Sequence, residues 1–288
     1  MGAFKPQHEF LVAIDSDGCV FDTMDLKHKE CFIPQFIRHY GLQAVANYAR
    51  QAAEFVNLYS KNRGCNRFIG LLLQLSLLAE RPEVAARGVT VEVPASLALW
   101  LRQAKSLGEP ALAEALATNP DPALERALAW SRDVNVAVAQ MVTGVPPFPW
   151  ARRCLESLRG RADMIVCSAT PTATLKSEWH EHGLAGHVRE IFGQEAGSKR
   201  TILEIAKAYE PGKVLMVGDA PGDRQAAEAH GAWFFPICPT REDESWAVLH
   251  DEGIERFLAG RYGKDFQNAL NTAFDQLLPD RPPWALQE

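Results

Sequence analysis

The chain has 288 residues, of which 47% are hydrophobic and 23% charged, and this composition excludes disordered and fibrous proteins. Its 30 basic and 36 acidic side chains give a net charge of −6, so we expect no nucleic-acid partner. No apolar run reaches the roughly 20 residues of a membrane span, and the N-terminal segment is too polar for a signal peptide. Six scattered cysteines without a CxxC pair favour reduced thiols, and we expect a cytoplasmic chain with no membrane partner.

The first predicted element is a strand at Phe10–Ile14, a short apolar run that ends in a polar cluster. Such runs are typical of strands buried on both faces, as in parallel sheets. The next segment, residues 23–143, contains one helical pattern after another and no convincing strand. The proline-rich run Val145–Pro149 then predicts a stiff hinge. We therefore expect an all-helical domain, residues 23–148, inserted after the first strand.

Three further apolar runs have the character of buried strands: 162–167, 213–217 and 232–237. Helical patterns, among them 201–209 and 223–230, separate these runs. Strands that alternate with helices predict an α/β fold with a Rossmann-like parallel sheet. We assign residues 1–22 and 149–288 to this core, including a helical extension from about residue 240 that carries packing residues such as Trp246.

Small or polar residues follow three of the predicted strands directly. In a parallel sheet these loops lie side by side at the carboxyl ends of the strands, where open α/β folds bind ligands. The acidic side chains expected to converge there are Asp15, Asp17, Asp219 and Asp223. Carboxylates so close together repel one another, which implies a cation, and an all-oxygen ligand set favours Mg²⁺ over Zn²⁺.

A basic and a hydroxyl side chain are expected at the same edge. Lys199 stands just before the helix predicted at 201–209, and Ser168 follows the second strand. Lys176 and Lys213 compete for the role of the lysine, although Lys213 opens a strand at the wrong end. Carboxylates, a hard cation, a lysine and a hydroxyl together suit phosphoryl transfer, because that reaction depends mostly on positioning and charge neutralisation.

These motifs resemble those of the haloacid dehalogenase-like (HAD) hydrolase superfamily. They are Asp15-x-Asp17-Gly after the first strand, Ser168 after the second, Lys199 before a helix, and Gly-Asp219-x-x-x-Asp223 after the third. Each motif alone is common in solvated turns and helix caps, but four in this order are far more specific. The helical insertion resembles the mobile cap of the phosphatase and β-phosphoglucomutase branch.

The resemblance implies roles for the acidic residues. Asp15 would be the nucleophile that forms an aspartyl-phosphate, and Asp17 the general acid for the leaving group and then the base for water. Asp15, the backbone carbonyl of Asp17 and Asp219 would ligate Mg²⁺, and Asp223 would support them. The presence of Asp17 fits dehalogenase and phosphonatase chemistry poorly.

The resemblance also implies that Ser168, the amide of Ala169 and Lys199 hold the phosphoryl oxygens. Cys19 departs from the family, which usually has Thr at this position. We expect this difference to tune local packing and hydrogen bonding rather than to abolish activity.

The helical insertion offers two candidate contacts to substrate. Arg63 and Arg67 lie in the segment 61–67, which opens a very apolar helix, and a guanidinium suits a phosphate or a carboxylate. The alternative is a solvated polar loop that caps this helix. The resemblance implies a magnesium-dependent phosphatase acting on a small phosphorylated metabolite. A phosphomutase of the β-phosphoglucomutase type and a catalytically weak module that binds phosphorylated ligands remain alternatives, and the sequence leaves substrate identity and oligomeric state open.

Overall fold

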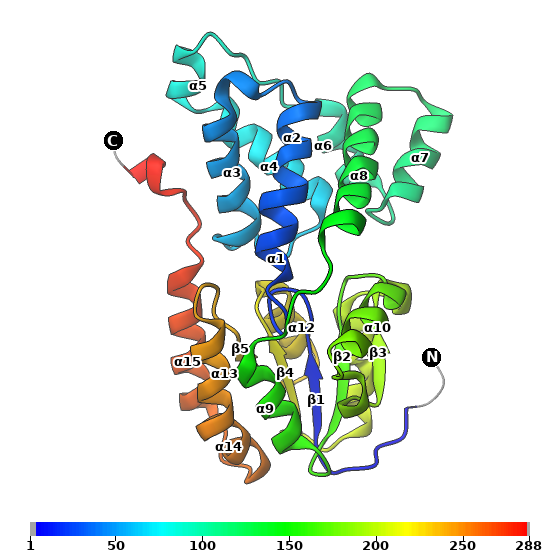
Figure 1. Ribbon diagram of the computed structural model, residues 1–288, viewed down its shortest axis with the longest axis vertical. Helices are drawn as coiled ribbons and strands as arrows, with labels where there is room; N and C mark the ends of the chain where they lie inside the picture. Colours follow the sequence, from blue (N-terminus) through cyan, green and yellow to red (C-terminus); the bar gives the residue numbers. More distant parts are fainter. Residues whose placement is uncertain (1–3, 287–288) are drawn as a thin grey trace. The chain divides into compact units, whose positions relative to one another are not determined.

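The computed structural model describes residues 4–286 and contains a five-stranded parallel sheet in the order β3-β2-β1-β4-β5 (Figure 1). The strands are β1 (Leu11–Ile14), β2 (Asp163–Cys167), β3 (Glu190–Phe192), β4 (Val214–Gly218) and β5 (Trp233–Pro236). The predicted parallel α/β class is therefore confirmed. Only β3 was not predicted, because it has three residues and none of them is fully buried.

The chain divides into two compact units, which we call the sheet unit and the helical unit. The sheet unit is Met1–Met24 with Gly144–Leu278, and the helical unit is Asp25–Thr143 with Pro279–Glu288. Pro279–Glu288 thus group with the helical unit. The reason is local packing within the helical unit, where the Trp284 ring meets Phe55 at 5.7 Å and the Arg81 guanidinium at 4.4 Å.

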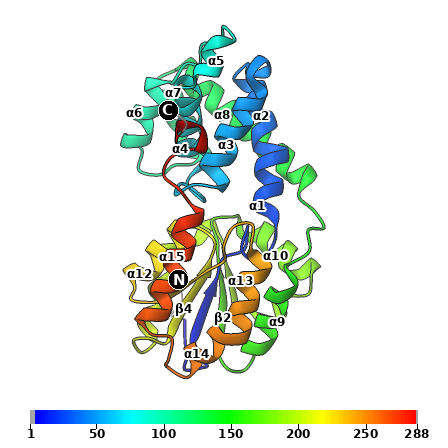
Figure 2. The ribbon, with the colours of Figure 1, turned by 90° about the vertical axis from the view of Figure 1, so that its left-hand side faces the viewer.

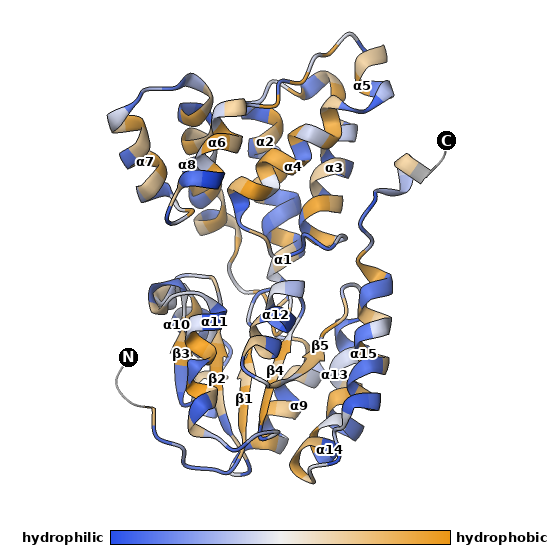
Figure 3. Cartoon of the chain, turned by 180° about the vertical axis from the view of Figure 1, so that it is seen from behind, coloured by the Kyte–Doolittle hydropathy of each residue, from blue (hydrophilic) through white to orange (hydrophobic). Residues whose placement is uncertain are grey.

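Both faces of the sheet are covered by helices, as Figure 2 shows. Val12 and Ile14 of β1 point to one face of the sheet, where they pack with residues of α9 (Pro149–Leu158), α10 (Thr172–Glu181) and α13 (Glu242–Val248). Leu11 and Ala13 pack on the other face with residues of α11 (Lys199–Ile202), α12 (Pro221–Ala229) and α15 (Lys264–Leu277). The alternation of side chains along a strand, with both faces buried, explains the continuous apolar runs of the sequence. Figure 3 shows this hydrophobic character along the strands.

The helices of the sheet unit differ at their ends from the predicted ranges. Their bounds are α9 (Pro149–Leu158), α10 (Thr172–Glu181), α11 (Lys199–Ile202), α12 (Pro221–Ala229), α13 (Glu242–Val248), α14 (Ile254–Leu258) and α15 (Lys264–Leu277). The helix predicted at 201–209 is a short α-helical turn, α11, followed by a 3-10 segment, Leu203–Ala208.

The helical unit has no strand in residues 25–143, as predicted. Together with α1 (Thr23–Leu26), which begins in the sheet unit, its α-helices are α2 (Ile33–His39), α3 (Ala46–Leu58), α4 (Arg67–Ala79), α5 (Pro82–Ala86), α6 (Ala95–Gln103), α7 (Glu109–Thr118) and α8 (Pro122–Met141). The Asn66 side chain accepts a hydrogen bond of 3.0 Å from the Phe68 amide and so caps the start of α4. Leu71 and Leu75 of this helix are fully buried. Within residues 4–286, none of the helices combines the length and apolar character that crossing a bilayer requires.

Candidate functional site

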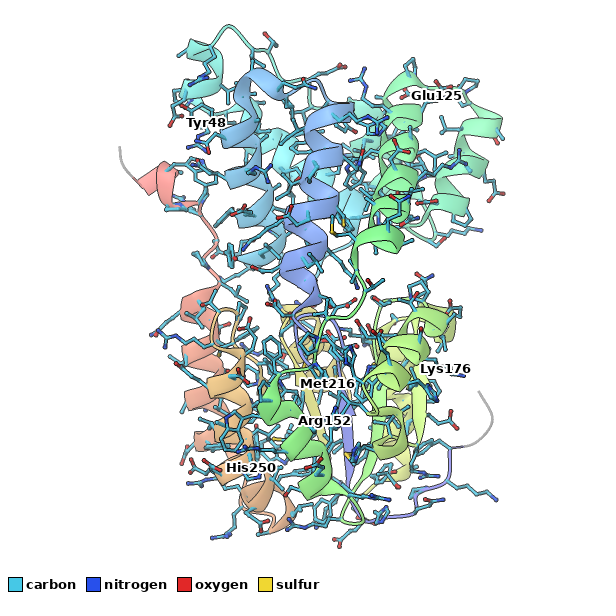
Figure 4. The ribbon with its side chains drawn as sticks, viewed as in Figure 1. Tyr48, Glu125, Arg152, Lys176, Met216 and His250 are labelled. Atoms are coloured by element: carbon cyan, nitrogen blue, oxygen red, sulfur yellow. The ribbon has the colours of Figure 1, made fainter. Side chains whose placement is uncertain are left out.

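Three loops meet at the carboxyl edge of the sheet. The register pairs Ile14 of β1 with Val166 of β2 and Val217 of β4, so the residues that follow these strands are level with one another. The amide of Asp15 also donates a hydrogen bond of 2.9 Å to the carbonyl oxygen of Val217. Met216, labelled in Figure 4, lies in β4 just before the turn that carries Asp219.

An acidic cluster forms at this edge. Carboxylate oxygens of Asp15, Asp219 and Asp223 all lie within 4.8 Å of one another, and the three side chains are buried. Lys199 Nζ lies 2.5 Å from Asp15 Oδ2 and 2.5 Å from Asp223 Oδ1. One ammonium does not balance three buried carboxylates, and hard oxygen donors are those that Mg²⁺ prefers. The donor set therefore fits Mg²⁺.

The electrostatics of the cluster are dominated by burial. Burial raises the pKa of Asp15 to about 6, Lys199 opposes this rise, and the nearby carboxylate of Asp219 adds to it. The pKa of Asp223 is likewise raised to about 6 by burial, against the opposing effect of Lys199. Burial alone would lower the pKa of Lys199, but the two carboxylates outweigh it and raise this pKa well above its usual range. A second cation at the cluster would favour the ionised carboxylates.

The position of Asp223 depends on a glycine and a helix start. Asp223 lies in the first turn of α12, and its Oδ2 accepts a hydrogen bond of 3.1 Å from the Ala220 amide. A Cβ on Gly218 would collide with the Asp223 carboxyl group, so the close approach of these two residues requires glycine. Asp223 therefore caps its helix and also pairs with Lys199.

The turn that carries Asp15 is anchored by two buried tryptophans. The Ser16 amide donates to Asp15 Oδ1 at 2.8 Å, and the Trp179 indole N–H donates to the Ser16 hydroxyl at 3.0 Å. The Trp246 indole N–H donates to the backbone oxygen of Cys19 at 2.7 Å. The sequence indicated only a packing role for Trp246, because an indole N–H has no positional signature in a sequence.

Asp17 lies outside the cluster of three and is held by hydroxyl groups. Thr23 Oγ1 lies 2.5 Å from its Oδ1, and Thr170 Oγ1 lies 2.5 Å from its Oδ2. Neither threonine was among the predicted site residues. In the sequence, the one signal that pointed to either threonine as a site residue was the position of Thr170, two residues after Ser168 in the same loop. The side chain of Asp17 is not among the three carboxylates that form the acidic cluster of the described residues.

Among the candidate lysines, Lys199 is the one that reaches the acidic cluster. Lys176 is exposed and projects outward from α10 (Figure 4), and Lys213 pairs with Glu9 at 2.7 Å near the start of β4. Ser168 is buried beside the loop backbone, whereas Ala169 is exposed. The structure therefore brings Lys199 to Asp15 and Asp223, and places Ser168 directly after β2, the strand that pairs with β1.

The two candidate arginines have partners inside the helical unit. Arg63 is buried and donates to the carbonyl oxygen of Leu58 at 3.0 Å. Arg67 NH1 donates to Ser131 Oγ at 2.9 Å and to Asn135 Oδ1 at 2.8 Å. These contacts join α4 to α8, a structural role that the sequence did not indicate for Arg67.

A match to a family model agrees with the motifs. A family model, the haloacid dehalogenase-like hydrolase, matches residues 11–231. No curated protein matches the chain.

Three solved structures resemble the chain at low sequence identity. A predicted phosphoglycolate phosphatase from Haemophilus somnus has 14% identity and a TM-score of 0.48, with 80% of this chain and 86% of that chain covered. A subfamily IA HAD-superfamily hydrolase from Geobacter sulfurreducens has 19% identity and a TM-score of 0.40, with 82% and 87% covered. The L-2-haloacid dehalogenase from Xanthobacter autotrophicus has 16% identity and a TM-score of 0.41, with 88% and 87% covered.

Proposed function

Because the chain belongs to the haloacid dehalogenase-like hydrolase family, we propose that it is a magnesium-dependent phosphatase that hydrolyses a small phosphorylated metabolite through an aspartyl-phosphate. The observation that carries this proposal is the buried cluster of Asp15, Asp219 and Asp223 with Lys199 between two of its members. A carboxylate attacks phosphorus only where the negative charge of the phosphoryl group is neutralised, and this edge of the sheet concentrates the groups that do so.

Asp15 and Asp219, with the backbone carbonyl of Asp17, would hold Mg²⁺, and Asp223 would support them. When bound, the ion supplies positive charge that neutralises the phosphoryl oxygens. Lys199 supplies further positive charge next to the Asp15 carboxylate, 2.5 Å from its Oδ2.

Ser168 is suited to donate a hydrogen bond to a phosphoryl oxygen. The Thr170 amide lies 3.3 Å from Ser168 Oγ and donates to it, so the proton of the Ser168 hydroxyl stays available for an anion. The amide of the exposed Ala169 is the second donor proposed for this loop.

The reaction has two steps. In the first, an Asp15 oxygen forms a bond to phosphorus, the bond from phosphorus to the leaving oxygen breaks, and Asp17 gives that oxygen a proton. In the second, water attacks phosphorus, Asp17 takes a proton from the water, and the bond from Asp15 to phosphorus breaks. One carboxyl group therefore serves as acid and then as base.

The test is phosphate release from a panel of sugar phosphates, nucleotides and phosphonates, with magnesium or with a chelator. We expect magnesium-dependent release from phosphate esters that Asp15→Asn abolishes. The matched control is Asp163→Asn, which replaces another buried aspartate, at the start of β2, and is expected to keep activity at a temperature where it remains folded.

Other outcomes would contradict the proposal in different ways. Isomerisation of a sugar phosphate without net phosphate release would indicate a phosphomutase. Binding of phosphorylated ligands without any turnover would indicate a regulatory module. Release from a phosphonate would show that the role given to Asp17 is wrong.

A further inference from the structure

Two hydroxyl groups from different segments hold the carboxylate of Asp17. Thr23 donates to Oδ1 and Thr170 donates to Oδ2, each over 2.5 Å. An ionised carboxylate only accepts hydrogen bonds, so each threonine points its single hydroxyl proton at Asp17. Hydrogen bonds to a charged acceptor are short and strong, and one on each oxygen opposes rotation of the group.

The backbone of Thr170 is fixed on both sides. Its amide donates to Ser168 Oγ at 3.3 Å, and its carbonyl oxygen accepts the Gln194 amide at 3.0 Å. A Cβ on Gly193 would collide with the Thr170 carbonyl and the Thr172 amide, so this loop packs closely against the segment that follows β3. The hydroxyl of Thr170 therefore comes from a rigid support.

Thr170 contributes little to the core. Its side chain is only partly buried. Replacement of a partly exposed side chain outside the apolar core is not expected to unfold the protein. Its contact with Asp17 is thus separable from folding.

We propose that Thr170 is a positioning residue, which orients the carboxyl group of Asp17 for proton transfer. This inference rests on the proposed function. A general acid acts only within roughly 2.6–3.2 Å of the atom that receives its proton. By holding Oδ2, Thr170 limits the rotation that would move the Asp17 proton away from the leaving oxygen.

The effect of losing Thr170 should depend on the leaving group. The oxygen of a sugar is a poor leaving group unless it receives a proton as its bond to phosphorus breaks. In contrast, p-nitrophenolate is a good leaving group without a proton. The value of kcat/KM reports the first step, in which the leaving group departs. A defect in orienting Asp17 therefore lowers kcat/KM for a sugar phosphate more than for p-nitrophenyl phosphate.

The experiment compares Thr170→Val, which keeps the shape but removes the hydroxyl, with Thr170→Ser, which keeps the hydroxyl. The matched control is Thr172→Val at the first residue of α10, because the Thr172 hydroxyl donates to Glu195 at 2.6 Å and not to Asp17. Each protein is assayed with p-nitrophenyl phosphate and with the sugar phosphate that the wild type hydrolyses fastest. Circular dichroism and thermal melting verify that each variant is folded.

We expect Thr170→Val to lower kcat/KM for the sugar phosphate by about 10- to 100-fold and for p-nitrophenyl phosphate by less than about threefold. Thr170→Ser should restore most of the loss, and Thr172→Val should show no difference between the two esters. Equal losses on both esters, or no loss on either, would overturn the inference while leaving the phosphatase proposal intact. A wild type that releases no phosphate from either ester would overturn both.

Discussion

The indole N–H of Trp246 donates a hydrogen bond of 2.7 Å to the backbone carbonyl oxygen of Cys19. This contact joins α13, far along the chain, to the turn that carries Asp15 and Asp17. Trp246 and Cys19 are both buried, so no water molecule replaces the bond when it is lost. The helices after residue 240 therefore support the site as well as the core.

Replacing Trp246 by Phe keeps an aromatic ring but leaves the Cys19 carbonyl without its partner. We expect Trp246→Phe to lower the free energy of unfolding by about 1–3 kcal/mol and to lower kcat. Urea denaturation and kinetics of phosphate release measure the two effects. Trp150→Phe, on the partly buried Trp150 of α9, is the control and should change kcat little. An unchanged kcat in Trp246→Phe would show that this anchor does not matter for catalysis.

Magnesium should stabilise the folded protein through the acidic cluster. A ligand that binds only the folded state at 100 times its Kd adds about 2.7 kcal/mol. We expect magnesium chloride to raise Tm by several degrees in the wild type and by much less in Asp219→Asn, as measured by calorimetry without substrate. A Tm increase that is equally large in Asp219→Asn would place the bound ion elsewhere.

The buried Asp163 should make stability depend on pH in the acid range. Burial alone would raise its pKa, but hydrogen bonds from the Tyr209 hydroxyl at 2.6 Å, His8 Nδ1 at 3.0 Å and the Gln7 amide at 2.8 Å lower it to about 2. Because the folded pKa lies below the unfolded value of about 3.9, the ionised form favours folding at higher pH. This stabilisation, about 2–3 kcal/mol, is complete above about pH 5 and is lost as the pH falls towards 2.

Comparison with Asp163→Asn isolates this contribution. The difference in unfolding free energy between wild type and variant should be about 1 kcal/mol smaller at pH 3 than at pH 5, by urea denaturation. A difference that stays constant with pH would show that Asp163 has an ordinary pKa in the folded protein.

Arg67 should matter for the stability of the helical unit. Its guanidinium donates to Ser131 and Asn135 of α8 and lies 5.1 Å from the ring centroid of Phe32. Arg67→Met keeps the aliphatic part and should lower the free energy of unfolding by about 1–3 kcal/mol. We expect KM to stay within about twofold of the wild-type value. A tenfold increase in KM without loss of stability would instead support a contact with substrate.

Cys19→Thr introduces the residue that is usual in the family. The thiol is buried, lies 3.8 Å from the Val217 carbonyl oxygen, and has its pKa raised well above the usual range by burial and the nearby carboxylates, so it is uncharged. Thr is close in size but buries a hydroxyl group, and we expect the free energy of unfolding to change by no more than about 1–3 kcal/mol and turnover to be unaltered. A large gain in kcat would show that Cys19 limits the reaction.

The sequence predicted the features that follow from periodicity and strand ends. Four strands were visible because burial on both faces leaves continuous apolar runs, as in β1 and β4. The meeting of Asp15, Asp219 and Asp223 could be expected because parallel strands share a carboxyl edge. The strand Glu190–Phe192 was missed, since three partly exposed residues give no such pattern.

Features that depend on side-chain direction could not be predicted in the same way. The hydrogen bond from Thr170 to Asp17 requires a particular rotamer of both residues and a loop packed against Gly193. The partners of Arg67 on α8 depend on how helices of the helical unit pack. Spacing along the chain contains neither kind of information.

The central place of β1 has a consequence for the order in which the protein folds. Leu11 pairs with Asp163 on one side and with Val214 on the other, so the first strand to be synthesised waits for two much later segments. Residues 25–143 of the helical unit are contiguous and complete far earlier. During synthesis residues 25–143 are therefore able to fold before the sheet is complete, and pairing across such long separations is slow. Asp15 acquires its partners Lys199 and Asp223 only when the sheet closes around β1, so the acidic cluster assembles late in folding.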